Sequence, residues 1–199
     1  MPRPAAVITR RPLGLYQTNT YIIHEEKSST CCIIDPGYQA DTILKKVSQL
    51  GLTVEAILLT HGHFDHVGAV KDIAADTDCR VFLCAEDTTL PPMFTAGKLY
   101  YTDTYTEGSV LNLAGLNIHV IHTPGHTPGS VCLMVERTMF SGDTLFAGSC
   151  GRTDIGGDWL TIQKSLRRLA AMEADFTVFP GHGESTTLAR EKQYNPYMK

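Results

Sequence analysis

The chain has 199 residues, of which 43% are hydrophobic and 19% are charged, and its formal net charge is −4. This composition is ordinary for a soluble globular protein with a sizeable core, and it favours a single domain over residues 1–199. The slight acidic balance provides no basic surface, so nucleic acid is not an expected partner.

The N-terminal segment contains neither a signal-peptide core nor a membrane span. Arg3, Arg10 and Arg11 interrupt its apolar stretches. No apolar run in the sequence approaches the ~20 residues that a membrane helix needs. We therefore expect a cytoplasmic protein without a membrane partner.

Strands and amphipathic helices alternate in the first half of the chain. Asp41 is predicted to cap a helix that ends at Gly51, and a second helix is expected from about His66 to Ala75. Residues 87–107 are rich in Thr, Tyr and Pro and are predicted to be an irregular loop, of the kind that covers a site. Apolar runs predict strands over residues 18–26, 30–37, 54–60 and 80–85.

The second half repeats this alternation. Asp158 is predicted to cap a helix that buries Ile162, Leu166 and Leu169, and a final helix is expected over residues 185–194. Two halves that each mix sheet and helix favour an α/β domain with helices packed outside the sheets. The predicted strands span residues 116–123, 130–136, 138–144 and 176–183.

The cysteines do not form a C-x-x-C pair, so the usual zinc-ribbon and redox spacings are absent. Cys150 lies in a glycine-rich loop, and its role is left open. The other five lie in or beside apolar segments and are expected to be buried, reduced thiols: Cys31, Cys32, Cys79, Cys84 and Cys132.

A dense group of ionisable residues follows the strand predicted over residues 54–60. His61 and His63 are two positions apart and point the same way in an extended backbone, while Asp65 and His66 approach from the turn into the next helix. Four unpaired ionisable groups beside a buried strand would cost several kcal/mol. A bound metal ion offsets that cost, so we interpret the group as metal ligands.

Three further donors follow predicted strands in glycine-flanked turns: His126, Asp143 and His182. We expect His24 and His119, which lie within strands, to be structural or exposed rather than metal ligands. His122 precedes a Pro-Gly turn, where a contact to a ligand residue remains open.

Imidazole and carboxylate ligands suit zinc, iron or manganese. Five imidazoles and two carboxylates are too many for one tetrahedral ion, and they suit two ions ~3.5–4 Å apart. Such a centre makes a metal-bound hydroxide available at neutral pH. The sequence therefore predicts two divalent ions, zinc being favoured and iron or manganese being possible.

The motifs THGHFDH (60–66), HTPGHTPGS (122–130), SGDTLFAGSCGRTD (141–154) and PGHG (180–183), in this order, resemble the metallo-β-lactamase superfamily. The resemblance implies an αββα sandwich with the metals at one edge. By this resemblance, one metal is held by His61, His63 and His126, the other by Asp65, His66 and His182, and Asp143 bridges them.

The short branch similar to glyoxalase II is the better match within this superfamily, and the run GHGESTTLAREKQYNPY also resembles it. The superfamily's β-lactamases usually lack a histidine at the position of His66, so the resemblance does not favour antibiotic hydrolysis. Full-length glyoxalase II carries a further helical domain that binds glutathione, whereas 17 residues follow His182 here. A smaller or different thioester is therefore also compatible.

The resemblance implies hydrolysis of a small-molecule thioester, such as a hydroxyacyl-glutathione, by the metal-bound hydroxide. Asp65 is the candidate for proton handling. Arg152 is the candidate for binding a substrate carboxylate, with a salt bridge to Asp154 as the alternative. Asp35 either holds a ligand histidine or only caps its turn.

Other activities of the superfamily remain as alternatives. CGRTD (150–154) also resembles the iron persulfide dioxygenases, whose single iron would be held at His61, His126 and Asp143. PGHG (180–183) argues for the hydrolases instead. A lactonase or esterase would use the same hydroxide. A nuclease is disfavoured by the acidic balance, and a non-enzymatic metal-binding module by the room that the site leaves for a substrate.

Overall fold

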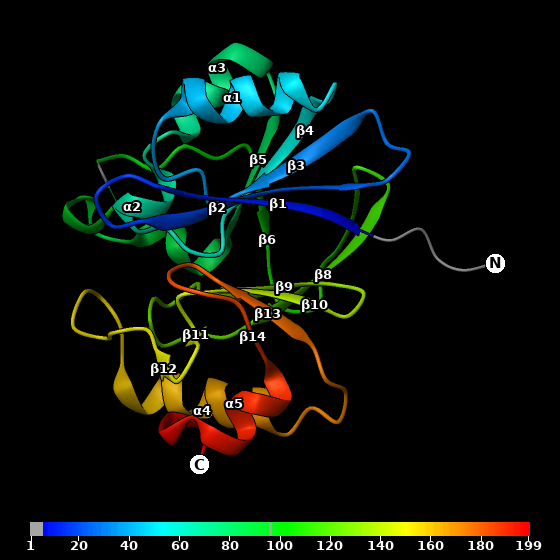
Figure 1. Ribbon diagram of the computed structural model, residues 1–199. Helices are drawn as coiled ribbons and strands as arrows, with labels where there is room; N and C mark the ends of the chain where they lie inside the picture. Colours follow the sequence, from blue (N-terminus) through cyan, green and yellow to red (C-terminus); the bar gives the residue numbers. More distant parts are fainter. Residues whose placement is uncertain (1–5, 96) are drawn as a thin grey trace.

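Two six-stranded β-sheets face each other, and helices cover the outer side of each sheet (Figure 1). This computed structural model describes residues 6–95 and 97–199. The arrangement is a four-layer αββα sandwich, which confirms the predicted fold class.

The first sheet has the order β1-β2-β3-β4-β5-β6. Its β1–β2 and β2–β3 pairs are antiparallel, whereas β3, β4, β5 and β6 run parallel to one another. The strands are β1 (Ala6–Leu13), β2 (Thr18–Glu25), β3 (Thr30–Ile34), β4 (Thr53–Leu58), β5 (Arg80–Cys84) and β6 (Asp103–Tyr105).

The second sheet has the order β14-β13-β10-β9-β8-β7. Only its β10–β13 pair is parallel. The strands are β7 (Val110–Leu113), β8 (Leu116–His122), β9 (Val131–Val135), β10 (Thr138–Gly142), β13 (Thr177–Pro180) and β14 (Thr186–Thr187), and a separate small hairpin is formed by β11 (Leu145–Phe146) and β12 (Ser149–Cys150).

The helices form the two outer layers and short turns beside them. Helices α1 (Ala40–Gln49) and α3 (Val70–Thr77) pack on the first sheet, and α4 (Trp159–Ala170) and α5 (Leu188–Tyr194) pack on the second. The short helix α2 (Phe64–Val67) lies between β4 and α3 in the chain. Three 3₁₀ turns span Ala85–Thr89, Pro92–Phe94 and Pro196–Met198.

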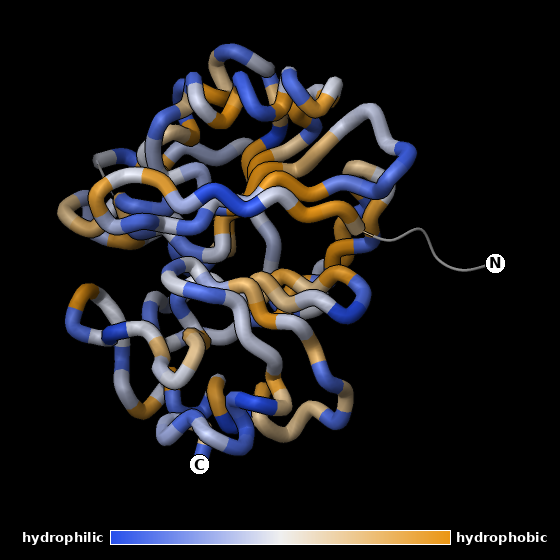
Figure 2. The backbone as a smooth tube through the Cα atoms, in the orientation of Figure 1, coloured by the Kyte–Doolittle hydropathy of each residue, from blue (hydrophilic) through white to orange (hydrophobic). Residues whose placement is uncertain are grey.

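Both faces of the central strands are buried, which explains their continuous apolar sequence. In β4, Leu58 joins the core between the sheets, whereas its neighbour Ile57 joins the core under α1 and α3. Figure 2 shows hydrophobic residues concentrated in the central strands, whereas hydrophilic and hydrophobic residues alternate along the outer helices. Each fully buried aliphatic side chain contributes about 1.5–3 kcal/mol, so these layers provide most of the drive to fold.

The boundaries of several elements differ from the sequence-based expectation. Asp41 does not cap α1: the helix starts at Ala40 after Gln39, and Asp41 lies in the first turn, where its carboxylate favours the helix dipole. The helix expected over about 66–75 consists of two helices, α2 and α3. The final helix starts at Leu188 because the Thr187 side chain accepts a hydrogen bond from the Arg190 N–H.

Other expectations are confirmed. Asp158 caps α4 by accepting a hydrogen bond from the Thr161 N–H. The cysteines are free, and all are buried except Cys150, which is partly exposed. Among residues 6–95 and 97–199, no helix combines the length and apolarity needed to cross a membrane.

The segment 87–107 is less irregular than expected, because it contains a 3₁₀ turn at Pro92–Phe94 and strand β6. It does border the histidine cluster: the ring centroid of Phe94 lies 6.4 Å from that of His63.

Candidate metal centre

The seven candidate ligands converge at one edge of the sandwich. His61 and His63 follow β4, and Asp65 and His66 lie in α2. His126, Asp143 and His182 come from the loops that follow β8, β10 and β13. Both sheets therefore contribute ligands, and the ends of their strands set the position of the cluster.

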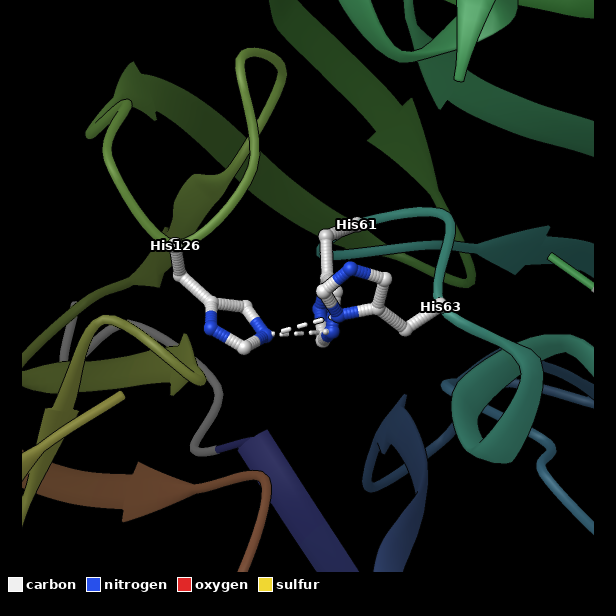
Figure 3. Close-up of side chains that lie close together, drawn as sticks. All are labelled: His61, His63 and His126. Carbon is white, nitrogen blue, oxygen red and sulfur yellow. Dashed lines mark hydrogen bonds between the residues drawn. The ribbon is translucent and has the colours of Figure 1, made fainter. Parts of the chain in front are cut away.

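His61, His63 and His126 form a first group, in which one ligand atom of each lies within 4.8 Å of the other two. Figure 3 shows the three rings pointing toward one another. Nε2 of His126 lies 2.8 Å from Nδ1 of His63 and 3.2 Å from Nε2 of His61.

The outward-facing nitrogens of the first group determine which tautomers are present. His63 Nε2 donates to the Ile155 carbonyl at 2.9 Å, and His126 Nδ1 donates to the Arg152 carbonyl at 2.6 Å. A carbonyl only accepts, so the inward nitrogens of both rings carry lone pairs rather than protons.

His61 follows the same rule through Thr60. The Thr60 hydroxyl donates to Asp35 Oδ2 at 2.6 Å, so at 3.1 Å it accepts from His61 Nδ1. His61 Nε2 therefore also points inward as a lone pair.

Three lone pairs this close repel one another unless a cation lies between them. A tetrahedral ion with metal–nitrogen distances of about 2.0–2.1 Å holds its ligands about 3.3 Å apart, close to the separations observed here. The residues of the first group therefore fit a metal ion.

Asp65, His66 and His182 form the second group. His66 Nδ1 donates to Asp35 Oδ2 at 2.9 Å, and His182 Nδ1 donates to the Tyr16 carbonyl at 3.0 Å. Their inward Nε2 atoms are 3.3 Å apart, and Asp65 Oδ2 lies 3.2 Å from His182 Nε2. This group offers two imidazoles and one carboxylate to a second ion.

Asp143 lies between the two groups. Its Oδ2 is 3.5 Å from His126 Nε2 and 3.5 Å from His182 Nε2, while Oδ1 is 3.4 Å from His66 Nε2. Oδ1 is buried and has no hydrogen-bond partner among the described residues. A buried carboxylate oxygen without a donor is costly, and a bridging position between two cations would satisfy it.

The two groups differ electrostatically. Burial and the neighbouring histidines lower the pKa of His61 far below its usual range and that of His63 to about 4. Burial also lowers the pKa of His66 and His182, but the carboxylates beside them outweigh it and leave both pKa values raised. The histidines oppose the effect of burial on Asp143 and keep the pKa of its carboxyl well below the usual value.

Asp35 is the main residue that orients the candidate ligands. Its carboxylate accepts hydrogen bonds from His66 Nδ1, from the Thr60 hydroxyl and from the Thr60 N–H, the last at 2.8 Å. It therefore holds His66 directly and His61 through Thr60. Asp35 was predicted either to hold a ligand histidine or only to cap its turn. The structure shows the contact that the first role requires, between Asp35 and the candidate ligand His66.

Asp87 is a positioning residue that the sequence did not reveal. Its buried carboxylate accepts hydrogen bonds from the N–H groups of Gly62 and Gly129 and from the Thr127 hydroxyl. It thereby ties the loop of His61 and His63 to the loop of His126. Its partners are two backbone N–H groups and one hydroxyl far away in the chain, so no local motif marks it.

Gly181 allows the close approach of the second group. A Cβ atom at this position would lie 2.2 Å from Asp143 Oδ1 and 2.7 Å from the His66 ring. Only glycine fits between these two side chains.

Two other candidates have different partners. The Arg152 guanidinium pairs with both carboxylate oxygens of Asp154, at 2.6 and 2.5 Å, and both side chains are exposed. His122 Nε2 donates to the Pro128 carbonyl at 2.7 Å, which is in the His126 loop, but no hydrogen bond joins its side chain to a candidate ligand side chain in the described structure.

Fold and site together define a metallohydrolase-like αββα protein, and the family is shown by sequence. Residues 13–182 match the metallo-beta-lactamase superfamily. The chain belongs to this superfamily. A relative from Haemophilus influenzae, named hydroxyacylglutathione hydrolase GloC, is 33% identical to this chain. The alignment covers 94% of this chain and 95% of that protein.

Solved structures agree with this assignment. BLEG-1 B3 metallo-beta-lactamase is 32% identical, with a TM-score of 0.89 over 96% of this chain and 99% of that one. TTHA1623 in a di-iron-bound form is 35% identical, with a TM-score of 0.83 over 95% and 99%. ETHE1 from Myxococcus xanthus is 28% identical, with a TM-score of 0.83 over 96% and 83%.

Proposed function

We propose that the protein is a metal-dependent thioester hydrolase whose substrates include a hydroxyacyl-glutathione. The convergence of five imidazole nitrogens and two carboxylates at the edge of the sandwich carries the hydrolase part of this proposal. The relative named hydroxyacylglutathione hydrolase, which aligns over nearly its whole length, supports the choice of substrate.

Two divalent ions fit the site, and we propose zinc as the most suitable, with iron or manganese as substitutes. When bound, such ions polarise a carbonyl and make a hydroxide available at neutral pH. His61, His63 and His126 would hold one, and Asp65, His66 and His182 the other, with Asp143 between them. The di-iron-bound form of TTHA1623 supports a two-ion centre and leaves the choice of metal to experiment.

Asp65 is the candidate for proton handling. Its Oδ2 accepts from the Thr18 hydroxyl at 3.2 Å and faces His182 Nε2. Burial raises the pKa of this carboxyl, but His182 and His66 lower it by more. The net pKa is below the usual value, so the group is ionised at neutral pH. The side chain is 12% exposed, which lets water reach it. Asp65 is therefore the candidate that would orient a water molecule and take part in moving its proton.

A thioester suits this arrangement because its leaving group does not need to be protonated as it departs. A thiol has a pKa of about 8.5, so a thiolate departs without a strong general acid beside it. Arg152 is the candidate for binding a carboxylate of the substrate, in exchange for Asp154.

The test is hydrolysis of lactoyl-glutathione by zinc-loaded, iron-loaded and metal-depleted enzyme. We expect turnover with a loaded form, little turnover without metal, and loss of turnover in Asp143→Asn. No turnover with any loaded form would remove the thioester proposal. The same preparations assayed with a cephalosporin and with simple lactones would separate the β-lactamase and lactonase alternatives.

A persulfide dioxygenase remains a second candidate. His61, His126 and Asp143 are the residues that the resemblance assigns to a single iron, and the ETHE1 structure shares the fold of this chain. Oxygen consumption by the iron-loaded enzyme with glutathione persulfide would support it, and would leave Asp65 and His182 without their proposed roles.

A further inference from the structure

A second cluster of metal-ligating side chains lies outside the seven-residue centre. Cys84, Glu86 and His122 each place one ligand atom within 4.8 Å of the other two. Cys84 is the last residue of β5 in the first sheet, and His122 is the last residue of β8 in the second (Figure 1). Glu86 follows in the 3₁₀ turn after β5. The three donors therefore come from both sheets.

We propose that Cys84, Glu86 and His122 form a further cation site that takes one thiophilic divalent ion, such as zinc, through a thiolate, a carboxylate and an imidazole. Those three donor types suit a borderline-soft ion and disfavour magnesium and calcium. Three protein ligands leave a position for water on the exposed side.

One side-chain hydrogen bond of His122 leaves a ring nitrogen free to bind a metal ion. Its Nε2 donates to the Pro128 carbonyl at 2.7 Å, so Nδ1 carries the lone pair. Metal-binding histidines commonly donate their second N–H to a backbone carbonyl in this way. His63, His126 and His182 at the main centre have the same arrangement.

The Cys84 thiol and the Glu86 carboxylate are already in contact. Cys84 Sγ donates to Glu86 Oε2 at 3.0 Å. An ion that binds here takes the place of the thiol proton, which leaves to solvent, so one proton is released for each ion bound. Affinity should therefore rise with pH, because burial and Glu86 raise the pKa of the thiol.

The cluster is open to solvent on one side only. Cys84 is fully buried, His122 is partly exposed and Glu86 is exposed. An ion can reach the carboxylate and imidazole from solvent and meet the sulfur at the inner end. The position is also held in place, because the next residue, Asp87, anchors the loops of Gly62 and Gly129.

The test is a Co²⁺ titration of the metal-depleted enzyme under reducing, anaerobic conditions, followed by absorbance. The main centre supplies only nitrogen and oxygen, so a thiolate-to-Co²⁺ charge-transfer band in the near ultraviolet reports this cluster alone. We expect the band to reach the intensity of one thiolate-bound ion per chain, to disappear in Cys84→Ser and His122→Ala, and to persist in Cys150→Ser as the matched control.

Absence of the band in the wild type, or its persistence in Cys84→Ser, would overturn the proposal. Because Cys84 is buried, Cys84→Ser is first checked for folding by circular dichroism. If it does not fold, His122→Ala at the partly exposed end decides, and an unchanged band there overturns the proposal. The readout does not depend on hydrolysis, so it stands or fails separately from the proposed function.

Discussion

The imidazoles at the metal centre owe their orientation to the ring nitrogen that faces away from it. His63, His126 and His182 each use a backbone carbonyl, whereas His66 uses the Asp35 carboxylate. A carbonyl cannot be altered by a side-chain substitution. Asp35 is therefore the place where the tautomer of a ligand can be tested directly.

Asp35→Asn should weaken metal binding. An amide NH₂ in place of Oδ2 cannot accept a hydrogen bond from His66 Nδ1. The ring proton would therefore move to Nε2, the nitrogen that faces the candidate metal centre. Asparagine tolerates the positive φ of 50° at this position, so the backbone should be preserved. We expect about 10–100-fold lower metal affinity, measured by competition with a chelating dye.

The control for this variant is Asp41→Asn, an exposed carboxylate in the first turn of α1. It should bind metal as the wild type does. Equal affinity in Asp35→Asn and Asp41→Asn would show that Asp35 only shapes its turn.

Arg152 allows a test of substrate binding. If its guanidinium binds a substrate carboxylate, Arg152→Ala should raise KM for lactoyl-glutathione roughly two- to fivefold and leave kcat nearly unchanged, because an exposed charged contact is screened by solvent. Asp154→Asn removes its competitor and should lower KM. Steady-state kinetics on both variants measure this, and unchanged KM in both would limit Arg152 to its surface ion pair.

At the scale of elements, the 3₁₀ turn Ala85–Thr89 connects two ligand-bearing loops through Asp87. Removing this carboxylate leaves the N–H groups of Gly62 and Gly129 without acceptors. Burial raises the pKa of Asp87 despite its hydrogen bonds, so losing the charge recovers part of the cost. The free energies of the lost bonds should therefore not simply add.

Asp87→Ala is expected to lower the free energy of unfolding by about 2–4 kcal/mol and to reduce bound metal. Urea denaturation and elemental analysis measure the two effects. Thr89→Ala, an exposed position in the same turn, is the matched control. A variant with full stability and full metal content would mean that the loops are held by other contacts.

The two ligand groups should release metal at different pH. Protons compete with metal for His66 and His182, whose pKa values are raised, more than for His61 and His63, whose pKa values are lowered. As pH falls, the ion held by Asp65, His66 and His182 should leave first. Elemental analysis after equilibration at decreasing pH should show an interval with one ion per chain.

That remaining ion should be absent in His63→Ala and present in His182→Ala. Release of both ions in a single step, or the reverse dependence on these variants, would contradict the assignment of the two groups.

At the scale of the whole molecule, the sequence predicts the layers better than their edges. The runs around Ile33, Ile57 and Leu133 are apolar because their strands are buried on both faces, and this pattern is readable. Strand β1 was not predicted, because it lies at a sheet edge and carries Arg10, Arg11 and Pro12.

Five of the seven candidate ligands were readable because each is a histidine or aspartate beside glycine after a strand, whereas Asp65 and His66 were readable because they lie within a few residues of His61 and His63. Asp87 and Thr60 were not, since their partners come from distant backbone or from a neighbouring side chain. The tautomers of the ligands likewise depend on tertiary contacts, such as that of His182 with the Tyr16 carbonyl.

The central claim is that seven side chains from both sheets form one centre for two ions. The most direct measurement is the metal content per chain, by elemental analysis of protein purified without added metal. We predict about two ions per chain in the wild type, and a clear loss in Asp143→Asn, in which an amide nitrogen replaces one of the two carboxylate oxygens that would bridge the ions. One ion per chain or fewer in the folded wild type, or two ions retained in Asp143→Asn, would contradict this account.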